Sequence, residues 1–506
     1  MSSKILSAAV VGLAAEIVEV EADTGGGQLG TFLVVGLPDA AVSESRERVR
    51  YAIKNSGLKF PNVKVSVNLA PADLKKHGPS YDLPIAISIL AVTDAIKIKE
   101  SLKDKIFLGE LAMSGDLRPI NGVLPIAIAA RQKNIKTIFV SSANAQEAKL
   151  VKDMEVIPVD NLAQLVAHLS GQASITPAEA REFDFANAEI IFDMAHIKGQ
   201  EHVKRAMEIA AAGAHNMLMS GPPGSGKTLI ARTMPSILPN LTLDEALEIT
   251  KLYSVAGQLA AGMALVTNRP FRSPHHTASG VALVGGGAWP RPGEISLAHR
   301  GVLFLDEFSE FPRQVLENLR QPMEDGIINV SRAAGSLSFP AKFILVAAMN
   351  PCPCGFAGDS EKNCVCSPAQ VLNYKKKISG PILDRIDLHI EVPRIKFEKL
   401  SDTSQAESSR NIKKRIEQAR LIQRTRFKDT PFITNSEMTS EAIRNFCPID
   451  DNSKQLLKSA VDQLHLSARG YFRILKLART IADLNQDEKM LTSHIAEALQ
   501  YRPKLD

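Results

Sequence analysis

The sequence predicts an α/β protein that folds into more than one domain. With 506 residues the chain is longer than a single hydrophobic core usually organises, and its 45% hydrophobic and 23% charged residues are typical of folded globular proteins. Short apolar runs with strand character alternate with helical segments up to residue 393, and the remainder is mainly helical. A glycine-rich segment also stands between an apolar run and a helical one, an order that is typical of parallel α/β sheets.

The composition excludes membrane-spanning and secreted proteins. The longest apolar runs, such as residues 83–92, are too short to span a bilayer. The first residues, Met-Ser-Ser-Lys-Ile-Leu-Ser, lack the apolar stretch and cleavage pattern of a secretory signal. We therefore expect a cytoplasmic protein with no membrane partner. The net charge of +5 permits a nucleic-acid partner without requiring one.

Changes in apolar periodicity divide the chain into domains. The first predicted domain spans residues 1–170, and residues 171–188, which carry little periodicity, are predicted to be a linker. The second predicted domain, residues 189–395, ends with an apolar strand before a polar run. The third, residues 396–506, is predicted to be helical because its apolar residues recur at helical spacing.

The first domain mixes strands and helices. The pattern predicts a strand at residues 64–69 and another at residues 137–140. Residues 83–95 are apolar over a longer stretch and predict a buried helix. We therefore expect an α+β domain.

A phosphate-binding loop opens the second domain. Residues 221–228 match the pattern G-x-x-x-x-G-K-[ST], between an apolar run at 216–220 and a helical segment at 229–234. In such a loop the backbone N–H groups surround the β-phosphate of ATP, the lysine neutralises the β- and γ-phosphate oxygens, and the threonine hydroxyl can bind Mg²⁺. The predicted ATP-binding residues are Gly221, Pro222, Pro223, Gly224, Ser225, Gly226, Lys227 and Thr228.

Two acidic residues follow the next strongly apolar strand. Residues 303–305 run into Asp306 and Glu307. Asp306 is placed to hold the Mg²⁺ of the nucleotide, and Glu307 is placed to polarise an attacking water. A pure nucleotide-binding switch would not need a carboxylate at position 307, so the sequence predicts ATP hydrolysis.

Three further polar residues stand where an ATPase would use them. Asn350 follows a buried apolar strand at residues 344–349, Arg385 lies in Ser-Gly-Pro-Ile-Leu-Asp-Arg-Ile-Asp, and Arg469 lies in Ser-Ala-Arg-Gly. By itself an asparagine after a strand is usually a turn residue, and a lone arginine is usually a surface residue. An asparagine at this place can also position the hydrolytic water.

Several longer stretches complete a family pattern. They comprise residues 197–200, 210–216, 270–276, 292–299 and 384–387. Together with the loop and the acidic strand, they resemble the AAA+ superfamily, and specifically the magnesium-chelatase-like ComM/YifB family. The resemblance covers essentially the whole chain. It implies a Lon-protease-like α+β N-terminal domain, a central AAA+ P-loop α/β domain with a parallel sheet, and a C-terminal helical lid.

The resemblance also implies roles for the three polar residues. Asn350 would be the sensor residue, Arg385 the arginine finger that reaches the ATP of a neighbouring subunit, and Arg469 the second sensor from the lid. A finger supplied by a neighbour implies a ring, expected to be a homo-hexamer. A guanidinium at the γ-phosphate can raise the rate by ~10³-fold or more.

The N-terminal domain resembles a protease that has lost its base. Residues 77–80, 109–111 and 117–124 are similar to the proteolytic domain of Lon, which uses a serine and a lysine. Ser80 is present, but the position expected for the lysine carries Ile126. Lys75 and Lys76 are the alternative bases, although in sequence they lie beside the serine rather than across the site. We expect a scaffold that shapes the ring or binds DNA or a partner, rather than an active protease.

Four cysteines gather in the loop at residues 351–367. They are Cys352, Cys354, Cys364 and Cys366. Cytoplasmic proteins rarely keep disulfides, so a structural Zn²⁺ bound by four thiolates is favoured over free thiols or redox chemistry. We interpret Cys447 as a buried thiol, and His275 and His276 as loop residues rather than metal ligands.

The substrate is suggested by the resemblance and by basic segments. The candidates for DNA contact are residues 269–291, a predicted hairpin at 328–339 with Arg332 near its bend, and the basic stretch 410–428. The resemblance implies a hexameric DNA translocase or helicase, acting on single-stranded and branched DNA and promoting branch migration while transforming DNA is integrated, with recombination proteins as partners. The alternatives are the ATPase motor of a metal chelatase or of a protein-remodelling complex, and a disfavoured ATP-dependent protease.

Overall fold

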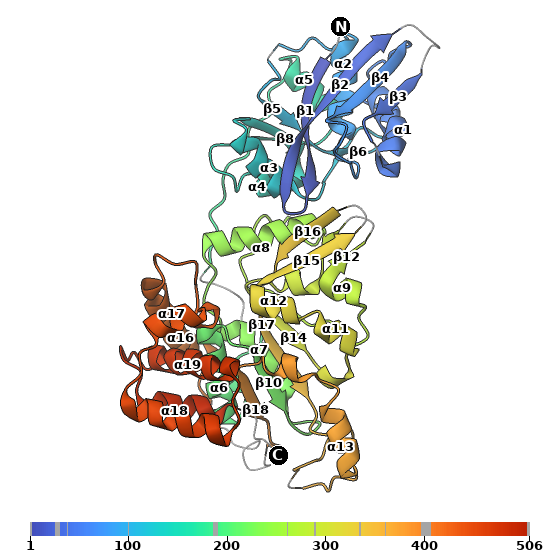
Figure 1. Cartoon of the computed structure of the whole chain (residues 1–506). Helices are drawn as coiled ribbons and strands as arrows, with labels where there is room; N and C mark the ends of the chain where they lie inside the picture. The colour runs from blue at the N-terminus through green and yellow to red at the C-terminus, as the bar shows by residue number, and fades with distance from the viewer. Residues whose placement is uncertain are drawn as a thin grey trace. The chain divides into compact units, whose positions relative to one another are not determined.

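The computed structural model divides the chain into two compact units (Figure 1). Residues 1–184 and 243–267 form the first unit, and residues 185–242 and 268–506 form the second. The structure describes residues 3–25, 31–37, 39–99, 101–185, 191–260, 262–287, 290–332, 335–359, 361–395 and 406–502. The end of the predicted linker, residues 186–188, lies outside them. The predicted domains follow chain order, whereas the compact units interleave, because residues 243–267 pack with the first unit.

A seven-stranded mixed sheet is the centre of the first unit, in the order β3-β4-β2-β1-β5-β8-β9. Its strands are β1 (Ser3–Val11), β2 (Ala14–Gly25), β3 (Phe32–Val35), β4 (Lys64–Ala70), β5 (Lys105–Phe107), β8 (Thr137–Ser141) and β9 (Glu155–Val159). Strands β1, β2 and β4 pair antiparallel, and the other neighbours pair parallel. In β4 the buried residues alternate with less buried ones, because successive side chains point to opposite faces of a strand.

Helices and a short hairpin complete the first unit. The helices are α1 (Ala40–Asn55), α2 (Asp82–Val92), α3 (Val123–Gln132), η1 (Ser142–Asn144), α4 (Ala145–Ala148), α5 (Leu162–Leu169) and α8 (Leu243–Ala256), and the hairpin pairs β6 (Glu110–Leu111) with β7 (Leu117–Arg118). Helix α2 is buried, as predicted for residues 83–95, but it ends at Val92 rather than at residue 95. Asp94 adopts a left-handed backbone conformation, with φ of 50°, which cannot continue a right-handed helix.

Helix α8 is held in the first unit by buried polar groups. The Ser254 hydroxyl donates to Glu147 Oε1 at 2.5 Å and accepts the Gly122 N–H at 2.9 Å. The Leu124 N–H also donates to Glu147 Oε1, at 2.9 Å. Burial raises the pKa of the Glu147 carboxyl, and its hydrogen bonds with Ser254 and Leu124 oppose that rise. The network joins α8 to the first residues of α3 through Glu147 of α4. It also gives the buried Glu147 carboxylate the hydrogen-bond partners that buried polar groups require.

A five-stranded parallel sheet is the centre of the second unit, in the order β11-β14-β17-β10-β18. Its strands are β10 (Met217–Ser220), β11 (Phe271–Arg272), β14 (Val302–Leu305), β17 (Ile344–Met349) and β18 (Leu388–Glu391). Every residue of β14 and β17 is buried, as expected for central strands of a parallel sheet covered on both faces. The predicted strands before the phosphate-binding loop, the acidic pair and Asn350 are thus neighbours in one sheet.

Short elements connect these strands. They are η2 (Met194–His196), α6 (Glu201–Gly213), α7 (Lys227–Ile237), α9 (Gly280–Val284), α10 (Glu294–Leu297), η3 (Phe308–Glu310), α11 (Arg313–Glu317), α12 (Arg320–Asp325), α13 (Pro368–Lys375) and α14 (Gly380–Leu383). Two antiparallel ribbons accompany them, β12 (Gly285–Gly286) with β13 (Arg291–Pro292), and β15 (Ile327–Arg332) with β16 (Gly335–Pro340). The predicted hairpin at residues 328–339 is confirmed by the pairing of β15 with β16.

The C-terminal helices share one core with the parallel sheet (Figure 1). They are α16 (Ser409–Arg426), η4 (Asn435–Glu437), α17 (Ser440–Phe446), α18 (Asp451–Gln463), α19 (Ala468–Leu484) and α20 (Thr492–Gln500). We call residues 406–502 the lid. Its helix α19 packs against α6, α16 and α20, so the lid belongs to the second unit. Among the residues described, no helix combines the length and apolar character needed to cross a membrane.

Candidate functional site

The phosphate-binding loop joins β10 to α7, as the sequence predicts. Gly226 has a φ of 88°, a left-handed conformation that glycine adopts without strain, and it directly precedes the helix. Gly221 is required for a different reason, because a Cβ at that position would lie 2.2 Å from the Val392 carbonyl oxygen. The loop therefore depends on glycine both for its turn and for its close approach to the end of β18.

Lys227 is held over this loop. Its ammonium donates to the carbonyl oxygens of Gly221 and Pro222, at 2.6 and 2.9 Å. The side chain of Asn350 approaches it too, with Oδ1 3.4 Å from Lys227 Nζ. Burial lowers the pKa of Lys227, and the nearby Asp306 carboxylate opposes that change. Lys227 and Asn350, which are 123 positions apart, meet because β10 and β17 are adjacent strands.

Thr228 and Asp306 also meet. The Thr228 hydroxyl donates to Asp306 Oδ2 at 2.7 Å, across 78 positions of sequence. The Glu307 N–H donates to the other carboxylate oxygen, Asp306 Oδ1, at 2.9 Å. A hydroxyl and a carboxylate side by side are hard oxygen donors of the kind that Mg²⁺ prefers. The residues present thus fit the metal that accompanies ATP.

Glu307 has a partner that sequence reasoning missed. Its Oε2 lies 3.0 Å from His276 Nδ1, and its backbone is left-handed with φ of 51°. The His276 ring in turn lies against the ring of His275, with centroids 4.1 Å apart. Strands β11 and β14 are parallel neighbours that pair Arg272 with Leu303, and His276 and Glu307 each lie four positions after this pair. That equal offset is the signal in the sequence that could have paired His276 with Glu307.

Arg385 and Arg469 form a second cluster with Glu324. Arg385 Nη2 donates to Glu324 Oε2, and Arg469 Nη2 donates to Glu324 Oε1 at 2.5 Å. The hydrogen bond from Arg385 is the main cause that holds the pKa of the Glu324 carboxyl below its ordinary value. Within the described part of the chain, no hydrogen bond or ion pair joins either arginine to the phosphate-binding loop.

A buried network supports the loop that carries Arg385. Arg473 of α19 donates to the Arg385 carbonyl oxygen and to Asp387 Oδ1, both at 2.6 Å. The Asn216 N–H donates to Asp387 Oδ2 at 3.1 Å, and His215 Nδ1 lies 3.4 Å from the same oxygen. Burial by itself would raise the pKa of the Asp387 carboxyl, but the charges of Arg473 and His215 hold it below its ordinary value. This network joins the lid, the start of β10 and the arginine loop.

The four clustered cysteines come together in space. Their Sγ atoms all lie within 4.8 Å of one another. Cys352 Sγ is 3.4 Å from Cys354 Sγ and 3.7 Å from Cys364 Sγ, and the last two are 3.6 Å apart. In a tetrahedral zinc site with Zn–S bonds of about 2.3 Å, the sulfurs are about 3.8 Å apart, so the residues present fit that metal. Cys447 is buried in the lid as predicted, and burial raises the pKa of its thiol to about 12.

The candidate protease residues of the first unit do not form a serine–lysine pair in the structure. Ile126 is 1% exposed and belongs to an apolar cluster of α3 and the sheet. The buried Lys76, close to Ser80 in sequence, donates its ammonium to the Pro71 carbonyl oxygen. Burial lowers the pKa of Lys76. The residue at the position expected for the Lon lysine is therefore an apolar core residue.

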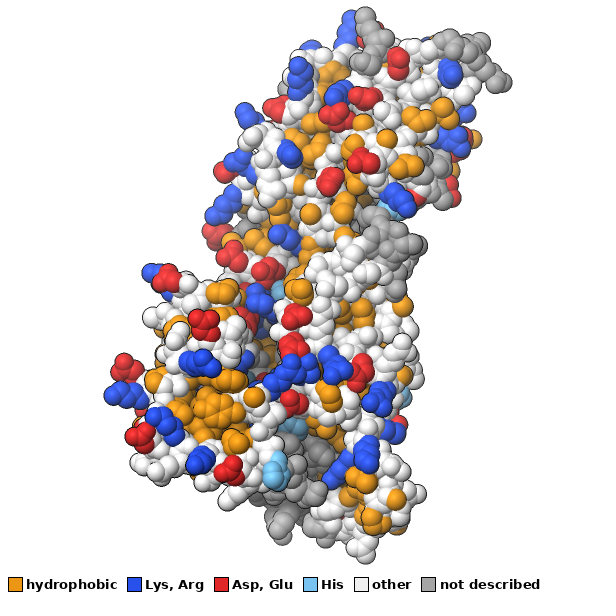
Figure 2. Space-filling model, in the orientation of Figure 1, with side chains coloured by type: hydrophobic (Ala, Val, Ile, Leu, Met, Phe, Trp, Pro, Cys, Tyr) orange, Lys and Arg blue, Asp and Glu red, His pale blue; other side chains and the backbone are white. Residues whose placement is uncertain are grey.

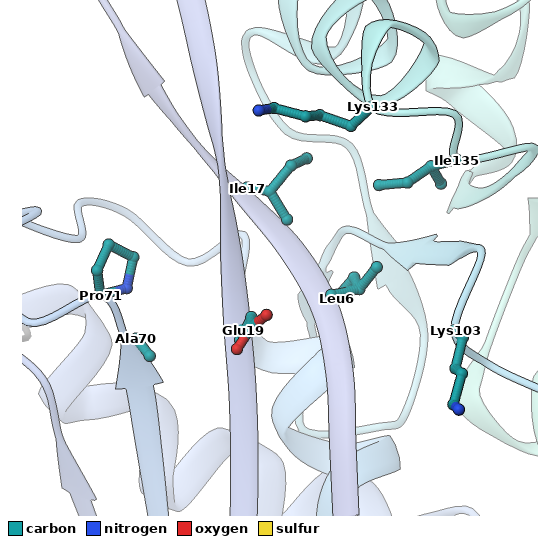
Figure 3. Close-up of a pocket in the computed structure, with 8 residues that line it drawn as sticks. All are labelled: Leu6, Ile17, Glu19, Ala70, Pro71, Lys103, Lys133 and Ile135. Atoms are coloured by element: carbon teal, nitrogen blue, oxygen red, sulfur yellow. The ribbon is translucent and has the colours of Figure 1, made fainter.

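A hollow in the first unit has a volume of about 520 Å³ (Figure 3). Its lining consists of Leu6, Ile17, Glu19, Ala70, Pro71, Lys103, Lys133 and Ile135. Glu19 is already paired, since its Oε2 lies 2.6 Å from Lys4 Nζ. The lining mixes apolar side chains with the charged side chains of Glu19, Lys103 and Lys133, and it includes no serine, cysteine or histidine.

Many of the basic residues proposed to contact DNA are engaged within the protein. Arg272 binds both carboxylate oxygens of Glu294, each at 2.6 Å, and Arg415 of α16 binds Glu208 at 2.6 Å. Arg426 binds Asp483 in the same way, through both of its terminal nitrogens. The bend of the hairpin at residues 333–334 and the side chain of Arg332 lie outside what the structure describes. The exposed basic residues of the stretch 410–428 are Arg410, Lys414, Arg424 and Lys428.

The surface agrees with this distribution of charges. Figure 2 shows basic and acidic side chains intermingled on one face of the second unit, rather than one continuous basic surface. Arg415 thus joins the lid to α6, whereas Arg426 is bound within the lid and Arg272 is bound outside it.

Comparison with known families matches three regions of the chain. Residues 193–400 match the family described as magnesium chelatase, subunit ChlI. Residues 18–144 match subunit ChlI of Mg-chelatase, and residues 406–502 match the C-terminal region of magnesium chelatase subunit ChlI.

Individual proteins are similar over nearly the whole chain. The sequence is 43% identical over 506 residues to competence protein ComM of Haemophilus influenzae, covering 98% of this chain and 97% of ComM. It is 42% identical over 496 residues to the uncharacterized protein YifB of Escherichia coli, covering 98% and 96%. A shorter match, 26% identical over 120 residues, covers 22% of this chain and 15% of the Lon protease of Rickettsia bellii. These matches and the parallel sheet confirm the predicted fold class.

Proposed function

This chain belongs to the magnesium-chelatase-like AAA+ family that includes ComM and YifB, and we propose that it is an ATPase that forms a hexameric ring and moves DNA. The observation that carries the ATPase is the convergence of polar residues at one edge of the parallel sheet. They are Lys227, Thr228, Asp306, Glu307 and Asn350, which we call the phosphate cluster. Ligands of open α/β sheets bind at the carboxyl ends of the strands, where these residues lie.

Each residue of the phosphate cluster has a chemical task in this proposal. The loop N–H groups and Lys227 bind the phosphates of ATP, and Thr228 and Asp306 hold the Mg²⁺ that accompanies them. The metal would neutralise charge on the phosphate oxygens. Glu307 accepts a proton from the attacking water, and Asn350 orients that water beside Lys227. A positioned carboxylate base contributes about 10²- to 10⁴-fold to such a reaction.

The arginines support a ring. Arg385, Arg469 and Glu324, which we call the arginine cluster, share one carboxylate outside the phosphate-binding loop. In a ring, Arg385 would leave Glu324 and reach the γ-phosphate of ATP bound to the neighbouring subunit. Arg469 would enter the same interface from the lid. A hexamer satisfies this arrangement because every subunit both binds ATP and supplies arginines.

DNA is the proposed substrate because the relative with 43% identity carries the name competence protein. We infer that the ring acts in the cytoplasm on single-stranded and branched DNA, driving branch migration while transforming DNA is integrated, alongside recombination proteins. The proposed phosphate contacts are the β15–β16 hairpin, the exposed Arg410, Lys414 and Arg424 of α16, and Lys428 just after that helix. We also propose a structural Zn²⁺ on the four clustered cysteines.

One experiment tests the proposal as a whole. ATP turnover of the purified protein is measured with and without single-stranded and branched DNA, together with its mass in solution. We expect DNA to stimulate turnover and the protein to sediment as six subunits when ATP is present. An ATP turnover rate that does not change when DNA is added would contradict the proposed DNA motor. A protein that stays monomeric under all conditions would contradict the proposed ring.

A second candidate is the ATPase motor of a chelatase-type or protein-remodelling complex. The observation that favours it is that all three family matches are named for magnesium chelatase subunit ChlI. Stimulation of the same ATPase by a chelatase partner or by unfolded protein, with no response to DNA, would support it. Degradation of a casein substrate would instead support the protease alternative. That alternative is disfavoured because the buried Ile126 stands at the position expected for the catalytic lysine.

A further inference from the structure

The cysteine loop, residues 351–359 and 361–367 of the described chain, begins directly at the phosphate cluster. Asn350 directly follows β17, and its Oδ1 lies 3.4 Å from Lys227 Nζ. Cys352 comes two positions later with a fully buried side chain. The placement of Cys352 therefore restricts where the Asn350 amide can lie.

The same loop presses on the phosphate-binding loop. Gly355 has a φ of 85°, and a Cβ at this position would lie 2.6 Å from Pro223 Cδ and 2.8 Å from Pro223 Cγ. Real side-chain carbons do not approach so closely, so only glycine permits the contact. Gly355 is set by a turn, since its N–H donates to the Cys352 carbonyl oxygen at 3.0 Å. The backbone of Cys352 thus helps to position Gly355, the residue that approaches Pro223.

The segment after the loop contacts η3, which follows the acidic pair. The loop continues into α13, where Tyr374 accepts a hydrogen bond from the Ser309 hydroxyl at 2.5 Å. Both side chains are buried, and Ser309 lies two positions after Glu307. Lys377 adds an ion pair with Glu310 at 3.1 Å. The cysteine loop therefore begins after Asn350 and contacts the phosphate-binding loop. The helix that follows it contacts the segment just after Glu307.

An apolar core does not hold this loop in place. Of its described residues only Cys352 and Gly355 are buried. A segment that buries so little apolar surface gains little from the hydrophobic effect and must be ordered by other bonds. One such bond joins Arg394 to Asp359 at 2.8 Å. Four thiolates on one metal would supply the bonds around Gly355, because metal binding free energy becomes folding free energy for the segment that carries the ligands.

We propose that the four-cysteine site is a positioning element of the ATP site, so that its metal occupancy controls nucleotide binding. Metal bound by Cys352, Cys354, Cys364 and Cys366 keeps Gly355 against Pro223 and keeps Asn350 beside Lys227. Loss of the metal releases the loop, and the phosphate-binding loop loses its outer support. This inference rests on the proposed ATPase and on the proposed zinc site. It states that ATP binding requires zinc on the four cysteines.

Two glycine variants separate contact from backbone strain. Gly355→Ala adds a Cβ against Pro223, whereas Gly358→Ala adds one in open space at a similar left-handed φ of 77°. Both variants keep all four cysteines. We expect both to retain one zinc per chain, and Gly355→Ala alone to weaken the binding of a fluorescent ATP analogue, by about ten-fold or more, because small displacements of a binding group carry costs of this size. Equal affinity in the two variants would overturn the proposal.

Metal removal gives a second and independent test. Zinc is stripped from the wild-type protein by a chelator and then restored, and the dissociation constant of the ATP analogue is measured at each stage. We expect affinity to fall and then recover, and Cys447→Ser protein to behave like the wild type. Unchanged affinity after the zinc has left, or wild-type protein that binds no zinc, would overturn the inference.

These experiments distinguish failure of the positioning role from failure of the proposed ATPase function. Wild-type protein that binds no ATP would contradict the ATPase itself. Wild-type protein that binds ATP, with affinity indifferent to zinc and to Gly355→Ala, would contradict only the positioning role. Circular dichroism of Gly355→Ala shows whether the variant is folded, and the zinc-removal experiment tests the same link without any substitution.

Discussion

The phosphate cluster and the arginine cluster are built on different principles. The phosphate cluster gathers residues at the ends of adjacent parallel strands and on the loop between β10 and α7, so the sheet itself brings them together. The arginine cluster joins α12, the turn after α14 and the first turn of α19. Its Glu324 and Arg469 side chains are 43% and 54% exposed, whereas Arg385 is only 7% exposed. The sheet organises the first cluster, whereas side chains from three separate helical segments form the second. In the proposed ring, the two clusters would meet across the interface between neighbouring subunits.

The strongest test of this comparison removes the arginine side alone. Arg385→Ala should bind ATP with unchanged affinity but lose turnover by about 10³-fold, because the transition-state charge at the γ-phosphate is no longer offset. Nucleotide affinity and steady-state turnover of the assembled ring are the measurements.

A mixing experiment decides whether the two clusters act across an interface. Lys227→Ala subunits should bind no ATP but still carry an intact Arg385. Mixed with Arg385→Ala subunits, they should restore part of the turnover, since an intact phosphate cluster then faces an intact arginine. Two inactive variants that stay inactive when mixed would argue that Arg385 acts within its own subunit.

The next largest effect is expected in the phosphate cluster. Glu307→Gln should bind ATP and retain the ring but slow turnover by about 100-fold or more, because the amide cannot accept the proton of the attacking water. Turnover at the wild-type rate would show that another group is the base.

His276 offers a finer test of the same cluster. His276→Ala should leave ATP affinity unchanged and reduce turnover by about ten-fold, because Glu307 loses the side chain that orients it at 3.0 Å. His275→Ala is the matched control, since His275 Nδ1 bonds within its own turn to Thr277 Oγ1 at 2.8 Å. A comparable loss in both variants would mean that the histidines only stabilise the loop.

The smallest effect concerns the cap of the lid helix that carries Arg469. Ser467 caps α19 by accepting the Gly470 N–H, and its hydroxyl also lies 3.2 Å from Asp384 Oδ1 beside Arg385. Ser467→Ala should lower the free energy of unfolding by about 1 kcal/mol, the usual cost of a lost N-cap. Thr439→Ala, which removes the cap of α17, should cost a similar amount.

Turnover separates these two caps. Only Ser467→Ala should also reduce ATP turnover, since only that cap contacts Asp384, the residue before Arg385. Thermal unfolding and turnover of the two variants are compared side by side. Equal turnover in both would show that the arginine cluster tolerates loosening of the lid helix.

Local patterns made the phosphate side of the site predictable. The glycine-rich loop, the acidic pair and Asn350 each follow a short apolar strand, and the structure places them at neighbouring strand ends. Arg385 and Arg469 had no such pattern, and their roles came from the family resemblance. His276 was interpreted as a loop residue because two adjacent histidines carry no signal of their own until β11 is paired with β14.

The basic stretch at residues 410–428 shows the limit of reasoning from charge. Its composition suggested a contact with DNA, yet Arg415 and Arg426 are bound to Glu208 and Asp483. Whether a basic residue is available to a partner depends on acidic residues far away in sequence. A charge run therefore identifies candidates, and the fold decides which of them remain exposed.

By itself the sequence determined the chemistry of contiguous segments. A phosphate-binding loop, buried strands and four closely spaced cysteines can be recognised because their geometry depends on neighbouring residues. Tertiary structure alone decided the pairings of single polar residues, such as Ser254 with Glu147 across 107 positions and Arg469 with Glu324 across 145. It also decided that α8 packs with the first unit and that Gly355 touches Pro223. Such contacts leave no periodic trace in the sequence, because each depends on the packing of elements that the chain brings together only after folding.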